Sequence, residues 1–572
     1  MNSDQLNSFE ILDEAPLTDS QNGVYLECVA DAGRTAYNCA YEFVFPADKI
    51  DARRLAQALD AVFARYSAFS TRLRVQNGEP SSILLADGAP KTVFFELTDE
   101  EYAEKKASFV RPFDLDMGEL ARAELVKTER NVYLLFDAHH VVFDGGTLRL
   151  LKNALDLAYR GEELPEEQTT LFDFSRLEQK REESGAVRKS YEYFDNLLGG
   201  VAVDSAPLPD KAAAGAGKRR ELQVDVDVDF NALDKLAKSA EASENVVFLA
   251  AFAYALAKFS DQNEALFVSV ESGRKGEEFR ASSGMFVRTF PLYFQIDDSK
   301  TVVDYVRDVK TRYKESMSRD HASFVKLANR HAIAADVKYV YQDDLHDPLI
   351  VDSVEGRLVA LRTDDPASKL DAQAFRSGEK RTLRLSYRDD LYSDEHIRQF
   401  ASLFVRILQG MASVGKLEEI VFAAERDVEF VERFNATERE YDDSKTVVDL
   451  FEEAAARNPN ALAVAYGERR RSYAEFDRLT KKLASFVADQ GIGRDRFVAI
   501  LAPRDDYAVV SAWGVVRSGA AYLPLDPSYP KERLNYMVKD AGIKLLVCDR
   551  ALRDMLDEYD GDVVYTDEIE AL

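Results

Sequence analysis

The sequence predicts a mixed α/β (α+β) protein with more than one domain. Its 572 residues exceed the roughly 100–200 residues of an ordinary domain. Short apolar strands alternate with amphipathic helices up to residue 425, and the alternation starts again at residue 447 after a polar stretch. Hydrophobic residues make up 46% of the chain, which is enough for packed cores and excludes a largely disordered chain.

Two strand–helix pairs are expected in the first part of the chain. The apolar runs at 37–45 and 132–136 are short enough for strands. Segments 51–65 and 146–160 repeat apolar residues every three or four positions, which predicts helices. Gly161 is expected to end the second helix.

Segment 201–220 is rich in Ala, Gly and Pro and is predicted to be a loop. The helix expected at 245–259, with Ser243 as its candidate N-cap, is apolar on nearly every side and should lie deep in a core. A further helix at 394–411 and three strands complete this part, with the strands at 224–228, 266–270 and 287–294.

Residues 426–446 are polar and charged, so we expect a linker there. Helices at 447–457 and 473–490 then alternate with strands at 462–466 and 497–501. Helix and strand alternating at this spacing predict a separate α/β unit.

The composition excludes several classes of protein. A net charge of −28 disfavours binding to a phosphate backbone, so nucleic acid is not an expected partner. There is no run of about 18 apolar residues and no basic and apolar leader, so neither a membrane span nor a secretory signal is expected. The 3 cysteines have no paired spacing, which argues against disulfides and zinc and favours the cytoplasm.

Two adjacent histidines, His139 and His140, follow the apolar run at 132–136. Neighbouring strand residues point to opposite faces, so one should face the structure and the other a cleft. Asp144 follows in a turn before Gly145. The residues alone also fit two core histidines with Asp144 as a helix N-cap. A metal site is poorly supported, because the histidines diverge and one carboxylate leaves the ligand set incomplete.

The string HHxxxDG at 139–145 resembles the signature of the condensation domain of non-ribosomal peptide synthetases. Other stretches resemble motifs of that family in the same order, and the resemblance covers about residues 12–425. They are PLTDSQ at 16–21 with VY at 24–25, RY at 65–66 with STR at 70–72, FDF at 172–174, VSVESGR at 268–274, GMFVRT at 284–289 and YRDDL at 387–391.

The resemblance implies two chloramphenicol-acetyltransferase-like lobes that form a V, at 12–178 and 179–425, with 426–446 as the linker. It also implies an active-site tunnel between the lobes. Donor and acceptor would enter from opposite ends as thioesters on the 4'-phosphopantetheine arms of carrier proteins, which are the expected partners. No tightly bound cofactor and no metal are expected. The acceptor amine would attack the donor thioester to form an amide.

The resemblance also assigns roles to residues of the motif. His140 would act on the amine as a base or hold the tetrahedral intermediate, and both roles stay open. His139 would be structural. Asp144 would pair with an arginine, for which Arg274 is the candidate. The backbone N–H of Gly145 is a candidate oxyanion donor.

Arg288 departs from the pattern, because the family usually has Asn at this position. Two interpretations follow from the residue type. The change is a harmless one at the surface, or it places a basic group in the tunnel that favours an acidic substrate.

Residues 447–572 resemble the start of an adenylation domain, through SYAEF at 472–476 and GAAYLPLDP at 519–527. The Ser/Thr/Gly-rich loop that would cradle ATP phosphates does not follow. We therefore expect a truncated adenylation domain without activity of its own, whose partner would be the rest of that domain. Strands such as 497–501 should lack the rest of their sheet, which would make this segment the least stable and the first cut by protease.

The leading hypothesis is an amide-forming condensation domain. Because the domain begins close to Met1, we expect no fused carrier before it. The donor would then be an acyl group, for a starter domain that N-acylates, or a peptidyl group from a separate protein. An epimerising relative acting at Cα and a non-catalytic scaffold that docks carriers remain alternatives, although domain order disfavours the first. Heterocyclising relatives carry Asp in place of the histidine pair and are excluded.

Overall fold

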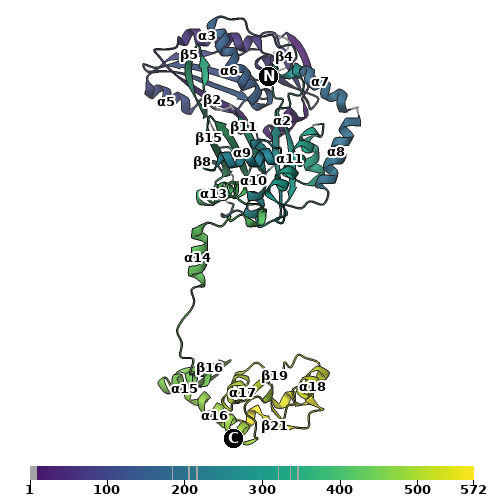
Figure 1. Cartoon of the computed structure of the whole chain (residues 1–572), viewed down its shortest axis with the longest axis vertical. Coiled ribbons are helices and arrows are strands. Elements are labelled where there is room, and N and C mark those ends of the chain that lie inside the picture. Colours follow the sequence, from purple (N-terminus) through teal and green to yellow (C-terminus); the bar gives the residue numbers. More distant parts are fainter. Residues whose placement is uncertain are drawn as a thin grey trace. The chain divides into compact units, whose positions relative to one another are not determined.

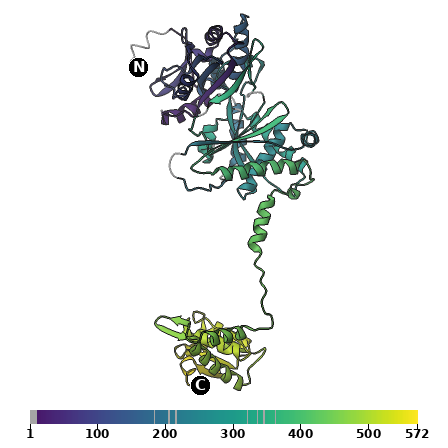
Figure 2. The same cartoon turned by 90° about the vertical axis from the view of Figure 1, so that its left-hand side faces the viewer.

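The computed structural model describes residues 10–572 except residues 32, 183–184, 204–205, 214–216, 320, 335, 344–346 and 362. The chain divides into two compact units, Met1–Val431 and Glu432–Leu572 (Figure 1). The first unit holds two six-stranded sheets, and each sheet with its helices forms a lobe (Figure 2).

The first lobe is built on a sheet with the strand order β12-β13-β2-β7-β6-β5. Helices α3 (Ala52–Arg65) and α6 (Gly145–Arg160) bury their apolar stripes against alternate residues of its central strands. Helix α5 (Asp99–Ala107) packs through Tyr102 with Leu135 of β7. The strands are β2 (Asn38–Pro46), β5 (Val93–Glu96), β6 (Ala121–Lys127), β7 (Asn131–His139), β12 (Leu349–Val351) and β13 (Val354–Leu361).

Strands β12 and β13 come from the later part of the chain but belong to the first lobe. Leu358 of β13 lies opposite Phe43 of β2, and the two strands run antiparallel. The predicted division at 178/179 therefore needs a correction, because 349–361 completes the sheet of the other lobe. Sequence periodicity reports which residues are buried but not which sheet a strand joins.

The second lobe is built on a sheet with the strand order β10-β9-β11-β14-β15-β8. Strand β11 runs parallel to both of its neighbours, while the other pairs are antiparallel. The strands are β8 (Arg219–Asp225), β9 (Glu264–Glu271), β10 (Arg288–Gln295), β11 (Val337–Asp343), β14 (Leu370–Ser377) and β15 (Lys380–Arg388).

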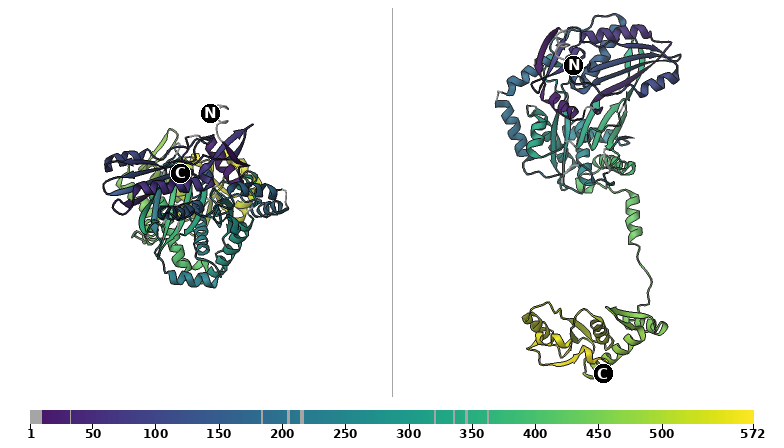
Figure 3. Two further views of the ribbon diagram at one scale, coloured as in Figure 1. Left: turned by 90° about the horizontal axis from the view of Figure 1, so that it is seen from above. Right: turned by 180° about the vertical axis from the view of Figure 1, so that it is seen from behind.

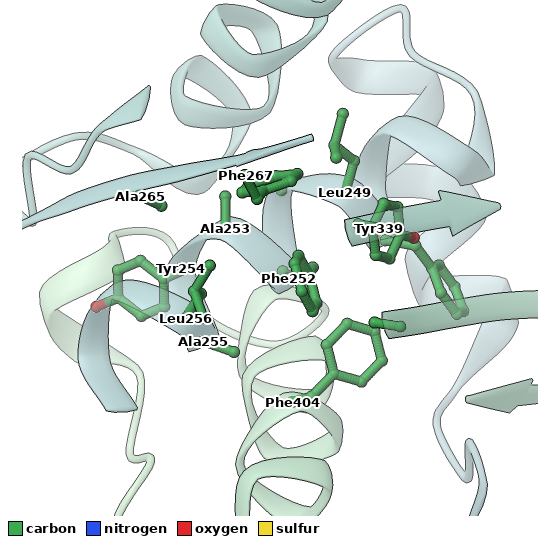
Figure 4. Close-up of a cluster of buried hydrophobic side chains, with 14 of the residues drawn as sticks. Leu249, Phe252, Ala253, Tyr254, Ala255, Leu256, Ala265, Phe267, Tyr339 and Phe404 are labelled. Atoms are coloured by element: carbon green, nitrogen blue, oxygen red, sulfur yellow. The ribbon is translucent and has the colours of Figure 1, made fainter. Parts of the chain in front are cut away.

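Helix α10 (Glu244–Phe259) forms the core of the second lobe. Every residue from Val246 to Ala257 is buried, as its all-round apolar sequence predicts. Figure 4 shows Phe252 among Phe267, Tyr339 and Phe404, which come from two strands and from α13 (Asp394–Met411). Helices α9 (Phe230–Ser239) and α11 (Val302–Ser318) complete this layer.

The remaining elements of the first unit cap and connect the two lobes. Strands β1 (Ile11–Pro16), β4 (Glu79–Leu85) and β3 (Thr71–Gln76) form a small sheet in that order. The helices are α2 (Asp19–Ala30), α4 (Ser67–Ser70), α7 (Leu171–Glu182), α8 (Gly185–Leu198), α12 (Phe324–His331) and α14 (Glu425–Asn435), of which α14 continues into the second unit.

The second unit contains a parallel sheet with the strand order β19-β18-β20-β21 and a hairpin of β16 and β17 (Figure 3). Apolar clusters cover both faces of the sheet. Its elements are α15 (Val447–Arg457), β16 (Leu462–Tyr466), β17 (Arg469–Ser472), α16 (Tyr473–Asp489), β18 (Phe497–Leu501), α17 (Asp506–Arg517), β19 (Ala521–Pro524), α18 (Lys531–Asp540), β20 (Leu545–Cys548) and β21 (Asp562–Tyr565).

The structure changes two expectations for this region. Strand 497–501 does not lack neighbours, because β19 and β20 flank it. Neither these two strands nor β21 was predicted from the sequence. The division between the two units lies within 426–446, where a linker was expected, but α14 (Glu425–Asn435) occupies the first half of that stretch. That helix has a strongly amphipathic sequence, which the high charge content obscured.

Most predicted elements lie within one or two residues of the observed ones. The strand expected at 224–228 is an exception, because β8 ends at Asp225. Val226 continues the alternation of buried and exposed residues and is itself buried. It lies beyond the end of the strand, although its N–H still donates to the backbone oxygen of Arg381 in the neighbouring strand. Within 201–220, the described residues before Arg219 form no helix or strand, and 204–205 and 214–216 lie outside the described residues.

No single helix in the described part of the chain is long and apolar enough to cross a membrane. Helices α9 and α10 meet the length and composition criteria together, but they meet at 97°. Because α10 is buried in the second lobe, its apolar sequence is accounted for by the core.

Candidate active site

Strand β7 carries the histidine pair to the edge of the first lobe. His139 is the last residue of the strand, and His140 opens a single 3₁₀ turn, His140–Val142, before α6. The His139 ring is buried: its Nδ1 accepts from the N–H of Val141 at 3.2 Å, and its Nε2 lies 3.5 Å from Sγ of Cys28. Burial lowers the pKa of His139 to about 3, so this ring is neutral at physiological pH.

His140 is held in one tautomer. Its Nδ1 lies 2.7 Å from the backbone oxygen of Phe143. A carbonyl oxygen can only accept, so Nδ1 carries the proton and Nε2 keeps the lone pair. Burial lowers the pKa of His140, although Asp144 partly opposes this effect. The backbone N–H of His140 donates to the oxygen of Tyr37 at 2.8 Å, which fixes the start of the turn.

Asp144 is both a helix cap and one half of an ion pair. Its Oδ1 accepts from the N–H of Thr147 at 2.9 Å and caps α6. Arg274 donates to both carboxylate oxygens, at 2.7 and 2.8 Å. Burial by itself raises the pKa of Asp144, but Arg274 and the hydrogen bonds outweigh it and the pKa is lowered. The two interpretations of Asp144 from the sequence, as a helix N-cap and as the partner of Arg274, are thus compatible.

The same carboxylate ties the two lobes together. Its Oδ2 also accepts from the N–H groups of Phe286 and Val287, at 2.9 and 3.3 Å, in the segment that leads to β10. A Cβ atom on Gly146 would lie 2.3 Å from Nη1 of Arg274, so only glycine lets the guanidinium approach this closely. We call Asp144, Arg274, Thr147 and the 284–287 segment the interlobe clamp.

Two cavities meet at His140. The first has a volume of about 320 Å³ and the second about 210 Å³. Both are lined by His140, Asp144, Gly145, Gln342 and Gln373. His139 and Arg274 line neither cavity. Their side chains instead bond to protein groups of the site, the N–H of Val141 and the carboxylate of Asp144. The histidines therefore face different surroundings, as expected for neighbours at a strand end.

Gly145 is the first residue of α6 and lies in the wall of both cavities. Within the described residues, the structure records no acceptor for its N–H. The first N–H groups of a helix have no partner inside the helix and carry its positive end. The Gly145 N–H can thus meet a negative oxygen next to His140.

Arg288 lines the first cavity but is not a free cation. It is only 8% exposed, so the interpretation as a change at the surface is wrong. Its Nη1 lies 2.5 Å from Oε1 of Glu178 in α7, and the other oxygen of Glu178 accepts from the N–H of Asp19 at 3.1 Å. Burial raises the pKa of Glu178, while Arg288 opposes the increase. The buried pair neutralises the positive charge that an acidic substrate would need.

Several residues of the site were not predicted from the sequence. Gln342 and Gln373 lie on β11 and β14, two strands that were not predicted, and Thr147 joins the clamp through its hydroxyl. The alternation in β11, with Lys338, Val340 and Gln342 on one side of the strand and the tyrosines on the other, was the available signal. Nothing in the sequence indicated that this face lines a cavity.

Comparison with known proteins identifies the class. The family model described as "Condensation domain" matches residues 11–419, so the chain belongs to the condensation-domain family. A second model, "AMP-binding enzyme", matches residues 451–570, and that domain is partial. The condensation domain is therefore one of a non-ribosomal peptide synthetase, followed by part of an adenylation domain.

Curated relatives are much longer. The chain is 28% identical to tyrocidine synthase 2 of Brevibacillus parabrevis over 552 residues, which is 93% of the chain and 15% of the relative. It is 26% identical to tyrocidine synthase 3 of the same organism over 571 residues, 95% of the chain and 9% of the relative. The chain thus spans a small fraction of the length of these synthetases.

Solved structures share the fold at low identity. One of them is a four-domain nonribosomal peptide synthetase in its holo form, bound to AMP and glycine, with a TM-score of 0.79 at 18% identity. The match covers 98% of this chain and 45% of the synthetase chain. Another is the condensation domain from the Monacolin K polyketide synthase MokA, with a TM-score of 0.62 at 18% identity. That match covers 71% of this chain and 100% of the MokA chain. The two lobes of the first unit thus have the fold of a condensation domain.

Proposed function

We propose that the first unit joins an acyl or peptidyl thioester donor to an aminoacyl thioester acceptor through an amide bond. Both substrates would arrive on phosphopantetheine arms of carrier proteins. The observation that carries this proposal is the position of His140, which lines both cavities with an unprotonated Nε2. Two arms that enter by different cavities meet at this side chain.

The chemistry matches what these groups can supply. The amine nitrogen attacks the thioester carbon, the C–N bond forms, and the carbonyl becomes an oxyanion. The C–S bond then breaks, the amine nitrogen loses one proton and the departing thiolate gains one. An α-amino group has a pKa of about 8, so a minor but usable fraction of the amine is neutral near physiological pH, and Nε2 of His140 accepts its proton as the nitrogen acquires charge. The Gly145 N–H stabilises the oxyanion.

Asp144 does not take part in proton transfer in this proposal. Its carboxylate is held by Arg274 and by two backbone N–H groups, so its lone pairs are already used. It sets the turn that places His140 and Gly145, and it is a positioning residue.

Incubating the full chain with loaded carrier proteins tests the proposal. Hexanoyl-loaded and alanyl-loaded carriers serve as donors, and carriers loaded with each proteinogenic amino acid serve as acceptors. Mass spectrometry of the acceptor arm should show an amide product. An inverted Cα centre without an amide would instead support the epimerising alternative, and unchanged arms with every pair would support the carrier-docking scaffold; either result overturns the proposal. A product with hexanoyl donor alone would identify a starter domain.

For residues 447–572 we propose no amino-acid activation by this chain alone. Residues 451–570 match only part of an AMP-binding enzyme, and the sequence contains no Ser/Thr/Gly-rich phosphate loop after residue 526. Exchange of radioactive pyrophosphate into ATP should stay at background with every amino acid. Exchange that depends on one amino acid would refute this.

A further inference from the structure

Two glutamines lie on the wall of the second lobe that faces His140. In the parallel pair β11–β14, Gln373 lies opposite Val340. Gln342 is two residues beyond Val340 and therefore points to the same face of the sheet. Both glutamines line both cavities, so the two carboxamides flank the place where the cavities meet.

The opposite face of the same strands is core. Tyr339 of β11 is buried in the apolar cluster around α10 (Figure 4). Ala372 and Ala374 of β14 belong to the same cluster. Each strand thus alternates between core and cavity, and nothing in the packing requires a polar side chain at the cavity positions. Valines occupy neighbouring positions on that wall, at 268, 270 and 340.

The charged side chains around the first cavity have partners in the protein. Lys338 is paired with Asp371 at 2.8 Å, Arg288 with Glu178 at 2.5 Å, and Glu27 accepts from the hydroxyl of Tyr37 at 2.7 Å. These groups are neutralised or hydrogen-bonded before any substrate arrives.

The glutamines differ from them. Over the described part of the chain, the structure records no hydrogen bond to the side chain of Gln342 or Gln373, although both are partly buried. A carboxamide offers two donor hydrogens and an acceptor oxygen, so both side chains have hydrogen-bonding groups for a molecule that enters the cavities. Both side chains line the two cavities together with His140 and Gly145.

We propose that Gln342 and Gln373 contact the reacting ends of both substrates and hold the donor carbonyl against the acceptor amine. Their N–H groups donate to the thioester oxygen on the side away from Gly145, and their oxygens accept an N–H of the amine. This inference rests on the amide-forming function proposed above. The two glutamines would be catalytic residues that complete the site from the second lobe, since His140 and Gly145 both come from the first.

Substitution by methionine tests the contact, because methionine keeps the length of glutamine and removes its hydrogen bonds. For Gln342→Met and Gln373→Met in the full chain, kcat/KM should fall at least about tenfold each, because each variant loses both of its hydrogen bonds to substrate. The substrates are the donor–acceptor pair from the carrier panel that the wild type joins fastest. Gln223→Met is the matched control, because Gln223 lies exposed on β8 of the same sheet, away from both cavities.

A binding measurement separates this inference from the proposed function. Alanyl-aminopantetheine carries an unreactive amide in place of the thioester, so its affinity can be measured by calorimetry without turnover. Each methionine variant should bind it at least threefold more weakly than the wild type, while Gln223→Met should bind it equally. If the wild type makes no amide but this difference persists, the function fails and the contact stands. The glutamine contact is overturned if kcat/KM and the affinity of both variants stay within twofold of the wild type. It is also overturned if Gln223→Met loses as much kcat/KM and affinity as they do.

Discussion

His139 and His140 are neighbours in the chain, yet they belong to different regions of the molecule. His139 ends a strand and is enclosed with Cys28 and the ring of Phe113, whose centroid is 5.9 Å away. His140 starts a turn and lines two cavities. The change from strand to turn between them, rather than the side-chain type, determines which ring lines the cavities.

Charge does not distinguish the two rings. Burial lowers the pKa of each below its ordinary value, so both are neutral at physiological pH. The difference is in what the ring nitrogens touch. Both nitrogens of His139 lie against protein atoms, at 3.2 and 3.5 Å, whereas His140 uses only Nδ1 in this way.

The largest expected effect is that of His140→Ala. Removing a general acid–base group costs about 10²–10⁴-fold in rate, so amide formation by the carrier assay should nearly vanish. The melting temperature should change little, because the ring lines the cavities and the loss is one hydrogen bond to the backbone oxygen of Phe143. Activity within about threefold of the wild type would show that the two histidines do not differ in the way we infer.

His331→Ala is the matched control for that variant. His331 lies at the end of α12 and pairs with Asp195 at 2.8 Å, and it lines neither cavity. Its removal should leave turnover at the wild-type rate. A loss as large as that of His140→Ala would point to a general effect on folding.

Asp144→Ala should affect both activity and stability. Breaking one side of a buried ion pair costs roughly 3–5 kcal/mol, and Arg274 is left without its partner. Thermal unfolding should therefore begin at a lower temperature, and turnover should fall because the turn that carries His140 loosens. An unchanged melting temperature with lost activity would make Asp144 a chemical participant instead.

The pH dependence gives an independent check on Asp144. Its pKa is lowered in the folded state, so its stabilising contribution is complete above the unfolded pKa of about 3.9 and is lost as the pH falls through the folded value. The difference in stability between the wild type and Asp144→Ala should shrink on acidification in that range. A difference that grows on acidification would contradict the assigned direction.

The sequence revealed the first lobe's half of the site but not the second lobe's. His140, Asp144 and Gly145 are adjacent in the chain, so a local motif and the geometry of a strand end were enough to place them. Gln342 and Gln373 reach the site through the pairing of β11 with β14, and Glu178 reaches Arg288 from α7. Such contacts depend on tertiary packing, which local periodicity does not encode.

The same reason explains the errors in the fold. Helices such as α13 and α15 were predicted to the residue because amphipathic spacing and caps are local. The partner of a strand is not local, so the membership of β13 in the first sheet and the neighbours of β18 were missed.

Gly146→Ala should have a smaller effect that acts on His140 at a distance. The new Cβ would overlap Nη1 of Arg274, 2.3 Å away, and the guanidinium would have to move from Asp144. Overpacking of this kind costs about 1–3 kcal/mol, so we expect a moderately lower melting temperature and a partial loss of turnover. Gly185→Ala is the control, since a Cβ there meets nothing within 4 Å. Equal behaviour of the two variants would show that the clamp does not set the turn.

The smallest expected effect is that of His139→Gln, measured as a change in pH dependence. The folded pKa of His139 is about 3 and the unfolded value about 6.5, so the unfolded chain binds the proton first. This histidine therefore lowers stability progressively as the pH falls from about 6.5 towards 3. Glutamine does not titrate, so the urea midpoint of His139→Gln should fall less steeply over that range than the wild-type midpoint, while turnover at neutral pH persists. Parallel curves of urea midpoint against pH for the two proteins would mean that His139 is not buried as a neutral ring. Lost turnover would mean that His139 takes part in the chemistry. Either result would remove the distinction between the two histidines.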